Sequence, residues 1–267
     1  MVKRIIISLI ILPVFVFLIF YKNPYFFVGL NIIALTMALN ELYVMLDKKG
    51  DKNFRLTGLA ISFVILALIT MQMEKSYIFF ASALFIMGLF FMVILKKDTG
   101  ELPRVFNTLG PVFYITVLGS FGILLRFIEP GGSWWVFLLG LLTLTYDGGA
   151  YFVGSAIGKH KLIPELSPGK TIEGCIGGIV INVIVAAIIS YTVLPKGFIA
   201  LHHVMILALL LSVTGQIGDI AESVIKRYSG VKNSSDLLPE HGGALDKIDS
   251  MMFNAPVLYF YIKTFLM

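Results

Sequence analysis

The sequence predicts an all-α polytopic membrane protein with about nine transmembrane helices, a cytoplasmic N-terminus and an external C-terminus. Of its 267 residues, 58% are hydrophobic and 14% are charged, whereas an ordinary soluble domain carries about 25% charged residues. Apolar runs of about 20 residues, long enough to cross a bilayer as a helix, recur along the whole chain. Lipid offers backbone N–H and C=O groups no partner, so these spans must be helical.

Polar segments separate the spans and set their bounds. At the N-terminus, Lys3 and Arg4 precede an apolar run that resembles a signal peptide, but no small-x-small cleavage site follows, and residues 21–24 read as a turn. We therefore expect a retained first span, and each later helix is expected to end where the next polar segment begins. The expected helices are residues 4–20, 25–46, 55–72, 76–95, 108–127, 133–157, 174–194, 199–225 and 250–266.

The distribution of basic residues predicts the sidedness of the spans. Sixteen of the 21 Lys and Arg residues lie in alternate loops, at residues 1–4, 47–55, 96–107, 158–173 and 226–249. Basic loops stay on the cytoplasmic side of a membrane, so every long polar loop is expected there. The net charge of +5 therefore indicates orientation and not binding to nucleic acid.

We expect a single membrane-embedded domain over residues 1–267. Its N-terminal scaffold spans are residues 1–139, and its catalytic spans and loops are residues 140–267. The scaffold holds few intramembrane polar groups. Among them, Asn40 and Glu41 lie near the inner end of a span, where snorkelling or a bridge between helices is favoured over chemistry.

Three polar clusters follow residue 140, and the first is Asp147. A carboxylate in an otherwise apolar span is energetically costly, which favours a functional role. The adjacent Gly148 and Gly149 also suit close helix packing, so by themselves they indicate no ligand.

The second cluster is the segment Ser167–Gly174, with the sequence SPGKTIEG. We expect a tight turn at Pro168-Gly169 and a helix cap from Ser167 or Thr171. Capping accounts for the two hydroxyls without a ligand, but it does not account for Lys170. A lysine beside a helix N-terminus suits a phosphate group. The candidate substrate-binding residues of this segment are Ser167, Lys170 and Thr171.

The third cluster begins with carboxylates on two helices. Asp219, then Glu222 or Ser223, and Lys226 recur at helical spacing and share one face. A Glu222–Lys226 ion pair is the alternative interpretation of that spacing. Asp246 and Asp249 are also one turn apart if the last helix begins near Leu245. Carboxylates from two helices can enclose one or two hard cations through oxygen ligands.

Magnesium is the expected cofactor. His241 has no second His or Cys near it, which argues against zinc, whereas carboxylates together with substrate phosphates are the usual ligands of Mg²⁺. The candidate metal ligands are Asp147, Asp219, Glu222, Asp246 and Asp249.

Basic residues and glycines accompany these carboxylates in the loop that follows. Cations can hold phosphate groups, and glycines let backbone approach a ligand, so the combination favours phosphoryl chemistry at a membrane surface. The P-loop pattern G-x-x-x-x-G-K-[ST] is absent from the sequence. The further candidates for substrate contact are Ser223, Lys226, Arg227, Lys232, His241, Gly242 and Gly243.

The motifs resemble a known family. The pattern S-x-x-K-R-x(4)-K from Ser223, continued by L-P-x-H-G-G-x-x-D-x-x-D up to Asp249, resembles the signature of the CDP-diacylglycerol synthases, also called phosphatidate cytidylyltransferases. D-x-x-A-Y at Asp147–Tyr151 and S-P-x-K-T-x-E-G at Ser167–Gly174 are typical of the same family. Together these motifs cover most of residues 147–249.

The resemblance implies an activity and a setting. CTP and phosphatidate would give CDP-diacylglycerol and pyrophosphate at the cytoplasmic leaflet of a bacterial inner (plasma) membrane, with magnesium as cofactor and a homodimer as the assembly. By matching position, the metal ligands would be Asp219, Asp246 and Asp249, with Asp147 and Glu222 close by. The contacts to nucleotide or lipid phosphates would be Lys170, Lys226, Arg227 and His241.

Two alternatives remain open at this point. The sequence does not specify the lipid tail, so the enzyme could be CTP-dependent but act on another lipid, like a polyprenol kinase or a CDP-archaeol synthase. A cation-coupled transporter would also carry Asp147 and Asp219 within its spans. The phosphate-like 226–249 loop and the lack of evident inverted repeats with broken helices disfavour the transporter.

Overall fold

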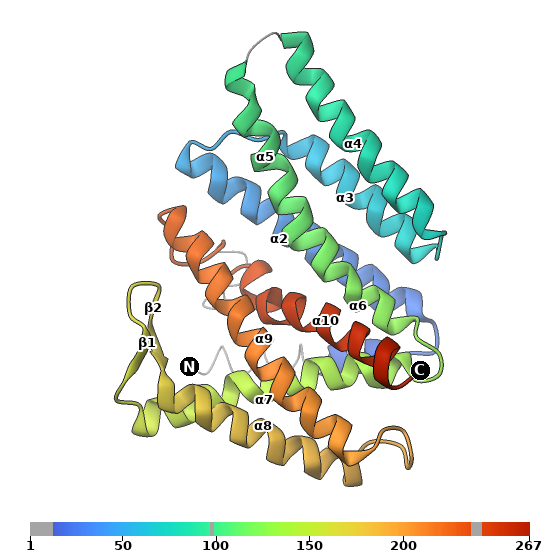
Figure 1. The fold of residues 1–267 in the computed structure, drawn as a ribbon, viewed down its shortest axis with the longest axis vertical. Helices are drawn as coiled ribbons and strands as arrows, with labels where there is room; N and C mark the ends of the chain where they lie inside the picture. The colour runs from blue at the N-terminus through green and yellow to red at the C-terminus, as the bar shows by residue number, and fades with distance from the viewer. Residues whose placement is uncertain (1–12, 97–98, 236–241) are drawn as a thin grey trace. The chain divides into compact units, whose positions relative to one another are not determined.

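The computed structural model describes residues 13–96, 99–235 and 242–267. The chain, drawn in Figure 1 with colour following residue number, divides into two compact units. Unit 1 comprises Met1–Ile128 and Ile225–Ile248, and unit 2 comprises Glu129–Val224 and Asp249–Met267.

The first part of unit 1 is helical from residue 13 to residue 20 and then continues in three long helices. These are α2 (Pro24–Lys49), α3 (Arg55–Thr70) and α4 (Lys75–Lys96). Asn23 caps α2 by accepting a hydrogen bond from the Tyr25 backbone N–H at 3.0 Å, and Gly50, with φ of 95°, ends the helix. The predicted bounds of these helices were right to within a few residues.

The next helical run begins earlier than the sequence predicted. It passes without a break through η1 (Thr99–Glu101), α5 (Leu102–Pro111), the π-helix η2 (Val112–Val117) and α6 (Leu118–Arg126). The expected helix began at residue 108, because polar side chains at the start of the run lower its hydropathy. Arg104, for example, donates to the Asn53 carbonyl at 3.1 Å and forms an ion pair with Glu101. Pro111 lacks a backbone N–H, and the π-helix begins directly after it.

A buried tyrosine joins α2 to α5 within unit 1. Tyr43 is 0% exposed, and its hydroxyl donates to the Thr108 carbonyl at 2.8 Å. Nearby, Arg55 donates to the Asn40 side chain at 2.8 Å, which is a bridge between helices of the kind expected at Asn40. These contacts fix the C-terminal part of α2, where Glu41 lies.

Unit 2 is built on two closely packed helices, α7 (Gly132–Ile157) and α8 (Ile172–Thr192). A Cβ atom on Gly174 would lie 2.7 Å from the Ala150 carbonyl oxygen, so only glycine permits this approach. The unit also contains most of α9 (Leu201–Tyr228) and of α10 (Leu245–Phe265).

A β-hairpin joins α7 to α8 and departs from the all-α prediction. Strand β1 (Lys161–Ile163) pairs antiparallel with β2 (Ser167–Thr171), with Ile163 opposite Ser167. The turn lies at residues 164–166. The tight turn predicted at Pro168-Gly169 was therefore wrong, since both residues belong to β2.

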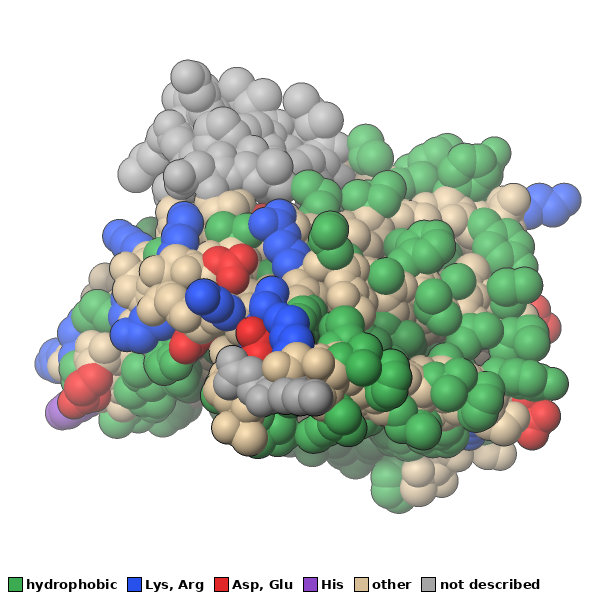
Figure 2. Space-filling view, turned by 90° about the horizontal axis from the view of Figure 1, so that it is seen from above, with side chains coloured by type: hydrophobic (Ala, Val, Ile, Leu, Met, Phe, Trp, Pro, Cys, Tyr) green, Lys and Arg blue, Asp and Glu red, His purple; other side chains and the backbone are tan. Residues whose placement is uncertain are grey.

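The helices suit a membrane. Six helical stretches in the described part of the chain are long and apolar enough to cross a bilayer, and Arg55–Thr70 is a shorter apolar helix. Large apolar side chains such as Phe79 on α4, 73% exposed, face outward. Much of the surface visible in Figure 2 is hydrophobic. The count of nine spans and the orientation of the termini stay predictions.

Candidate metal and phosphate site

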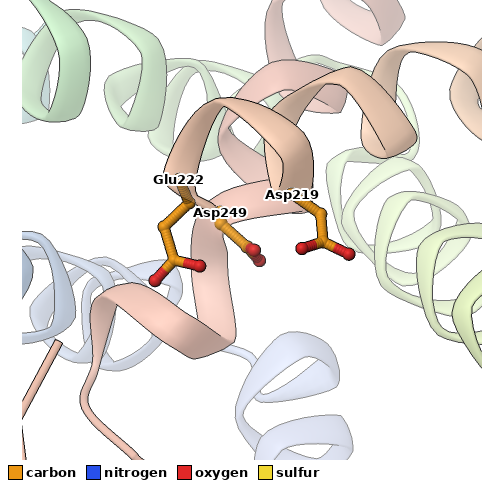
Figure 3. A group of neighbouring side chains, drawn as sticks. All are labelled: Asp219, Glu222 and Asp249. Carbon is orange, nitrogen blue, oxygen red and sulfur yellow. The ribbon is translucent and has the colours of Figure 1, made fainter. Parts of the chain in front are cut away.

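Three carboxylates from two helices meet in unit 2. Asp219 and Glu222 lie one turn apart on α9, and Asp249 lies on α10 (Figure 3). One oxygen from each lies within 4.8 Å of the others. Glu222 and Asp249 are only 1% and 8% exposed. The predicted carboxylate pair on α9 is thus joined by one of the two carboxylates predicted on α10.

A glycine allows the two helices to approach at this point. A Cβ atom on Gly218 would lie 2.7 Å from the Asp249 carbonyl oxygen and 3.0 Å from the Phe253 ring. Further along α10, the Asn254 amide donates to the Thr143 hydroxyl at 2.8 Å and its oxygen accepts from the Thr214 hydroxyl. Gly218 and Asn254 together set the position of Asp249 beside α9.

The β-hairpin brings a lysine to this acidic group. Lys170 Nζ lies 2.6 Å from Asp219 Oδ2, and its side chain is 17% exposed. Asp147 on α7 is close enough to interact electrostatically with both Asp219 and Lys170. Three carboxylates and one lysine leave a formal charge of −2, and all the ligand atoms offered are hard oxygens. The donor set therefore fits a divalent cation such as Mg²⁺.

Asp246 belongs to a second polar cluster, in unit 1. Its Oδ1 is 2.7 Å from Lys226 Nζ. Its Oδ2 accepts from the Ser234 hydroxyl at 2.8 Å and from the backbone N–H groups of Ser234 at 3.0 Å and Gly243 at 2.8 Å. Gly242 has φ of 83°, a conformation that favours glycine. The Gly242-Gly243 segment thus folds back onto the Asp246 carboxylate.

Sequence reasoning missed the role of Glu41 in this second cluster. Its carboxylate accepts hydrogen bonds from Ser234, Ser235, Ala244 and Leu245. Only its place as an acidic residue in an apolar span pointed to it, and that feature favoured snorkelling or a bridge. The structure shows a bridge, made to residues 193 to 204 positions away in the sequence.

Each of the remaining residues predicted for the site has its own local environment. Thr171 caps α8, because its hydroxyl accepts from the Gly174 backbone N–H at 3.1 Å. Ser167 begins β2, and Ser223 is buried on α9. Arg227, which donates to the Val231 carbonyl at 3.4 Å, and Lys232 are exposed. His241 lies outside the described residues.

Known proteins match this chain over almost its whole length. A family model described as the cytidylyltransferase family matches residues 2–265. The phosphatidate cytidylyltransferase of Bacillus subtilis (strain 168) is 36% identical over 277 residues, which covers 99% of this chain and 98% of the relative. The phosphatidate cytidylyltransferase of Thermotoga maritima is 32% identical, covering 88% of this chain and 87% of the relative. That of Staphylococcus haemolyticus is 33% identical, covering 86% and 88%.

Proposed function

Because the chain belongs to the cytidylyltransferase family, we propose that it is a phosphatidate cytidylyltransferase, which makes CDP-diacylglycerol and pyrophosphate from CTP and phosphatidate. Relatives that carry this name match almost the full length of the chain. The resemblance predicted from the sequence motifs is confirmed by the family match, and the protein is a nucleotidyltransferase.

The reaction is a displacement at phosphorus. A phosphate oxygen of phosphatidate forms a bond to the α-phosphorus of CTP, and the bond from that phosphorus to the bridging oxygen of the β-phosphate breaks, so that pyrophosphate leaves with the electron pair. A phosphate monoester is already an anionic nucleophile at neutral pH. The protein must therefore mainly position crowded anionic oxygens and neutralise their charge.

The site assignment rests on one observation, the close approach of the carboxylates of Asp219, Glu222 and Asp249. We assign these three carboxylates as the Mg²⁺ ligands, since they offer oxygen atoms within 4.8 Å of one another. When bound, Mg²⁺ supplies charge neutralisation to the phosphate oxygens and a template that orients them. Asp147, near Asp219, supplements this negative charge. Asp246 is assigned a different task, that of holding Lys226 and the Gly242-Gly243 segment.

Lys170 is the leading candidate for a phosphate contact. It lies in ion-pair distance of Asp219, so a phosphate bound beside Asp219 would lie within reach of its ammonium group. A lysine ammonium group acts as a point charge and binds phosphate through a charge-assisted hydrogen bond. Arg227 and Lys232, exposed around the end of α9, supply further positive charge for the lipid headgroup or the nucleotide.

The apolar helices indicate a membrane-embedded protein. The basic loops favour an active site on the cytoplasmic leaflet, where phosphatidate could keep its tails in the bilayer while its headgroup reaches the carboxylates. Homodimerisation is proposed from the family resemblance.

A reconstitution experiment tests this function. Purified protein in lipid vesicles is supplied with CTP, phosphatidate and Mg²⁺, and CDP-lipid and pyrophosphate are expected in equal amounts. A lipid kinase would instead release CDP and phosphorylate its lipid. A cation transporter would make no nucleotide-linked lipid. Replacing phosphatidate by an archaeal ether lipid phosphate or a polyprenol distinguishes the other lipid-directed enzymes.

A further inference from the structure

Glu41 makes four hydrogen bonds with one segment of the chain. Its Oε1 accepts from the Ser235 hydroxyl at 2.6 Å and from the Ala244 backbone N–H at 2.9 Å. Its Oε2 accepts from the Leu245 backbone N–H and from the Ser234 hydroxyl, both at 2.9 Å, and the single hydroxyl proton of Ser234 is shared with Asp246 Oδ2 at 2.8 Å. The side chain is 6% exposed, and each oxygen joins one donor that precedes residues 236–241 to one that follows them.

The two backbone donors lie at the start of α10. The first N–H groups of a helix have no partner within the helix, and the positive end of the helix dipole attracts an anion there. Glu41 supplies that anion from α2, 203 and 204 residues away from the two donors. It therefore acts as a helix cap contributed by a distant part of unit 1.

The same carboxylate leaves no room for a side chain at residue 243, which is a glycine. A Cβ atom at Gly243 would collide with both carboxylate oxygens of Glu41 and with the Ser234 hydroxyl. The sequence suggested that the glycine pair lets backbone approach a ligand. For Gly243, the group approached is a side chain of the protein itself.

We propose that Glu41 is a positioning residue, an internal anion that fixes the Gly242-Gly243 segment and the start of α10. This helix carries Asp246 in its first turn and Asp249 one turn later. Glu41 contacts neither substrate in this proposal, and its effect on the reaction passes through the helix. The expected effect on activity rests on the proposed function, whereas the expected effect on the backbone does not.

The Glu41→Gln variant is the primary test. An amide keeps the size of the side chain but offers one acceptor oxygen in place of two, and its NH₂ group would face donors. Hydrogen exchange measured by mass spectrometry on a peptide covering residues 242–249 should become at least about ten-fold faster, because a hydrogen bond to a charged group is lost. In the CDP-lipid assay, kcat should fall roughly ten- to hundred-fold, and the half-saturating Mg²⁺ concentration should rise. If part of the variant protein were simply misfolded, the maximal rate would fall but the half-saturating Mg²⁺ concentration would not change.

Glu101→Gln is the matched control. Glu101 also lies in unit 1, but it forms ion pairs with Lys96 and Arg104 at 3.0 and 3.2 Å near the surface, and such pairs contribute little. In the Glu101→Gln variant, hydrogen exchange over residues 242–249 and the Mg²⁺ dependence of activity should match those of the wild type. Glu41→Asp, which keeps the charge, should recover part of the kcat lost in Glu41→Gln.

A Glu41→Gln protein with wild-type exchange over residues 242–249 and wild-type Mg²⁺ dependence would overturn the proposal. If the Glu41→Gln variant does not fold, Ser235→Ala removes one hydrogen-bond donor to Glu41, and the same exchange measurement is made on it. We expect faster exchange over residues 242–249. Unchanged exchange would contradict the positioning role of Glu41. If the wild type makes no CDP-lipid, the proposed function fails, and the exchange data still decide whether Glu41 holds the start of α10.

Discussion

Substitution of Gly218 by alanine should displace Asp249, one of the three neighbouring carboxylates, without changing any charge. The new Cβ atom would lie 2.7 Å from the Asp249 carbonyl oxygen, where ordinary contact begins at 3.4 Å. Relief requires a shift of about 0.7 Å, the difference between these two distances. The neighbour is backbone, so no flexible side chain can turn away, and α10 must move relative to α9 at Asp249.

The size of that shift sets the expected effect. Catalytic groups must be held to within about 0.5 Å, and a misplacement of about 1 Å can cost roughly a hundred-fold in rate. We therefore expect kcat of Gly218→Ala to fall about ten- to hundred-fold and the half-saturating Mg²⁺ concentration to rise. Overpacking of this kind also costs about 1–3 kcal/mol of stability, which a lower unfolding temperature would report.

The assay is CDP-lipid formation over a series of Mg²⁺ concentrations, with the unfolding temperature measured in the same detergent. Gly29→Ala and Gly88→Ala are the matched controls, because a Cβ at either helical position meets nothing within 4 Å. Both controls should keep wild-type rates and Mg²⁺ dependence. A Gly218→Ala enzyme with normal kcat and an unchanged Mg²⁺ requirement would refute the claim that the α9–α10 contact positions the metal ligands.

Three further predictions test the site and the topology. Asp219→Asn and Asp249→Asn should each abolish turnover while the protein stays folded, since each removes a ligand charge; a near-normal rate at limiting Mg²⁺ would remove that residue from the ligand set. Lys170→Gln should lower kcat/KM roughly ten- to a few-hundred-fold through the loss of a charged hydrogen bond, and an unchanged value would leave Ser167–Gly174 as a capped hairpin without a phosphate contact. In a Cys175→Ala background, cysteines placed at Lys232 and Met267 should react with an impermeant reagent from opposite sides of the membrane, and labelling from one side only would contradict the nine-span topology.

Much of the helical architecture could be predicted because lipid leaves the backbone few alternatives. Helices such as α3 and α7 are predominantly apolar and end at polar segments, so hydropathy predicted their ends to within a few residues. Two features escaped this reasoning for local reasons. The helical run from Thr99 begins with paired polar side chains that lower its hydropathy. The β1–β2 hairpin is too short to give a periodic signal.

The candidate site was predictable only where it depends on spacing along one helix. The three-residue interval placed Asp219 and Glu222 on the same face of α9, and the structure has them together. Spacing could not decide whether Asp246 or Asp249 would join them, because both lie on α10. That choice depends on the α9–α10 contact at Gly218. Nor could spacing reveal Glu41, whose partners are 193 to 204 residues away in the sequence.

Lys170 and Lys226, the two lysines that the family resemblance implied as phosphate contacts, are each paired with a carboxylate, and this pairing explains how charges can gather in so apolar a protein. Lys170 pairs with Asp219 at 2.6 Å, and Lys226 pairs with Asp246 at 2.7 Å. A buried charge left alone costs several kcal/mol, whereas a pair that is also hydrogen-bonded offsets most of that cost. Asp246 has this further support from backbone N–H groups. Asp219 instead belongs to the group of three carboxylates, so Lys170 offsets charge at the place where the metal and the phosphates are proposed to bind. The two ion pairs are chemically alike, but the Lys226–Asp246 pair lies in a cluster that holds the Gly242-Gly243 segment, whereas the Lys170–Asp219 pair is proposed to serve the reaction.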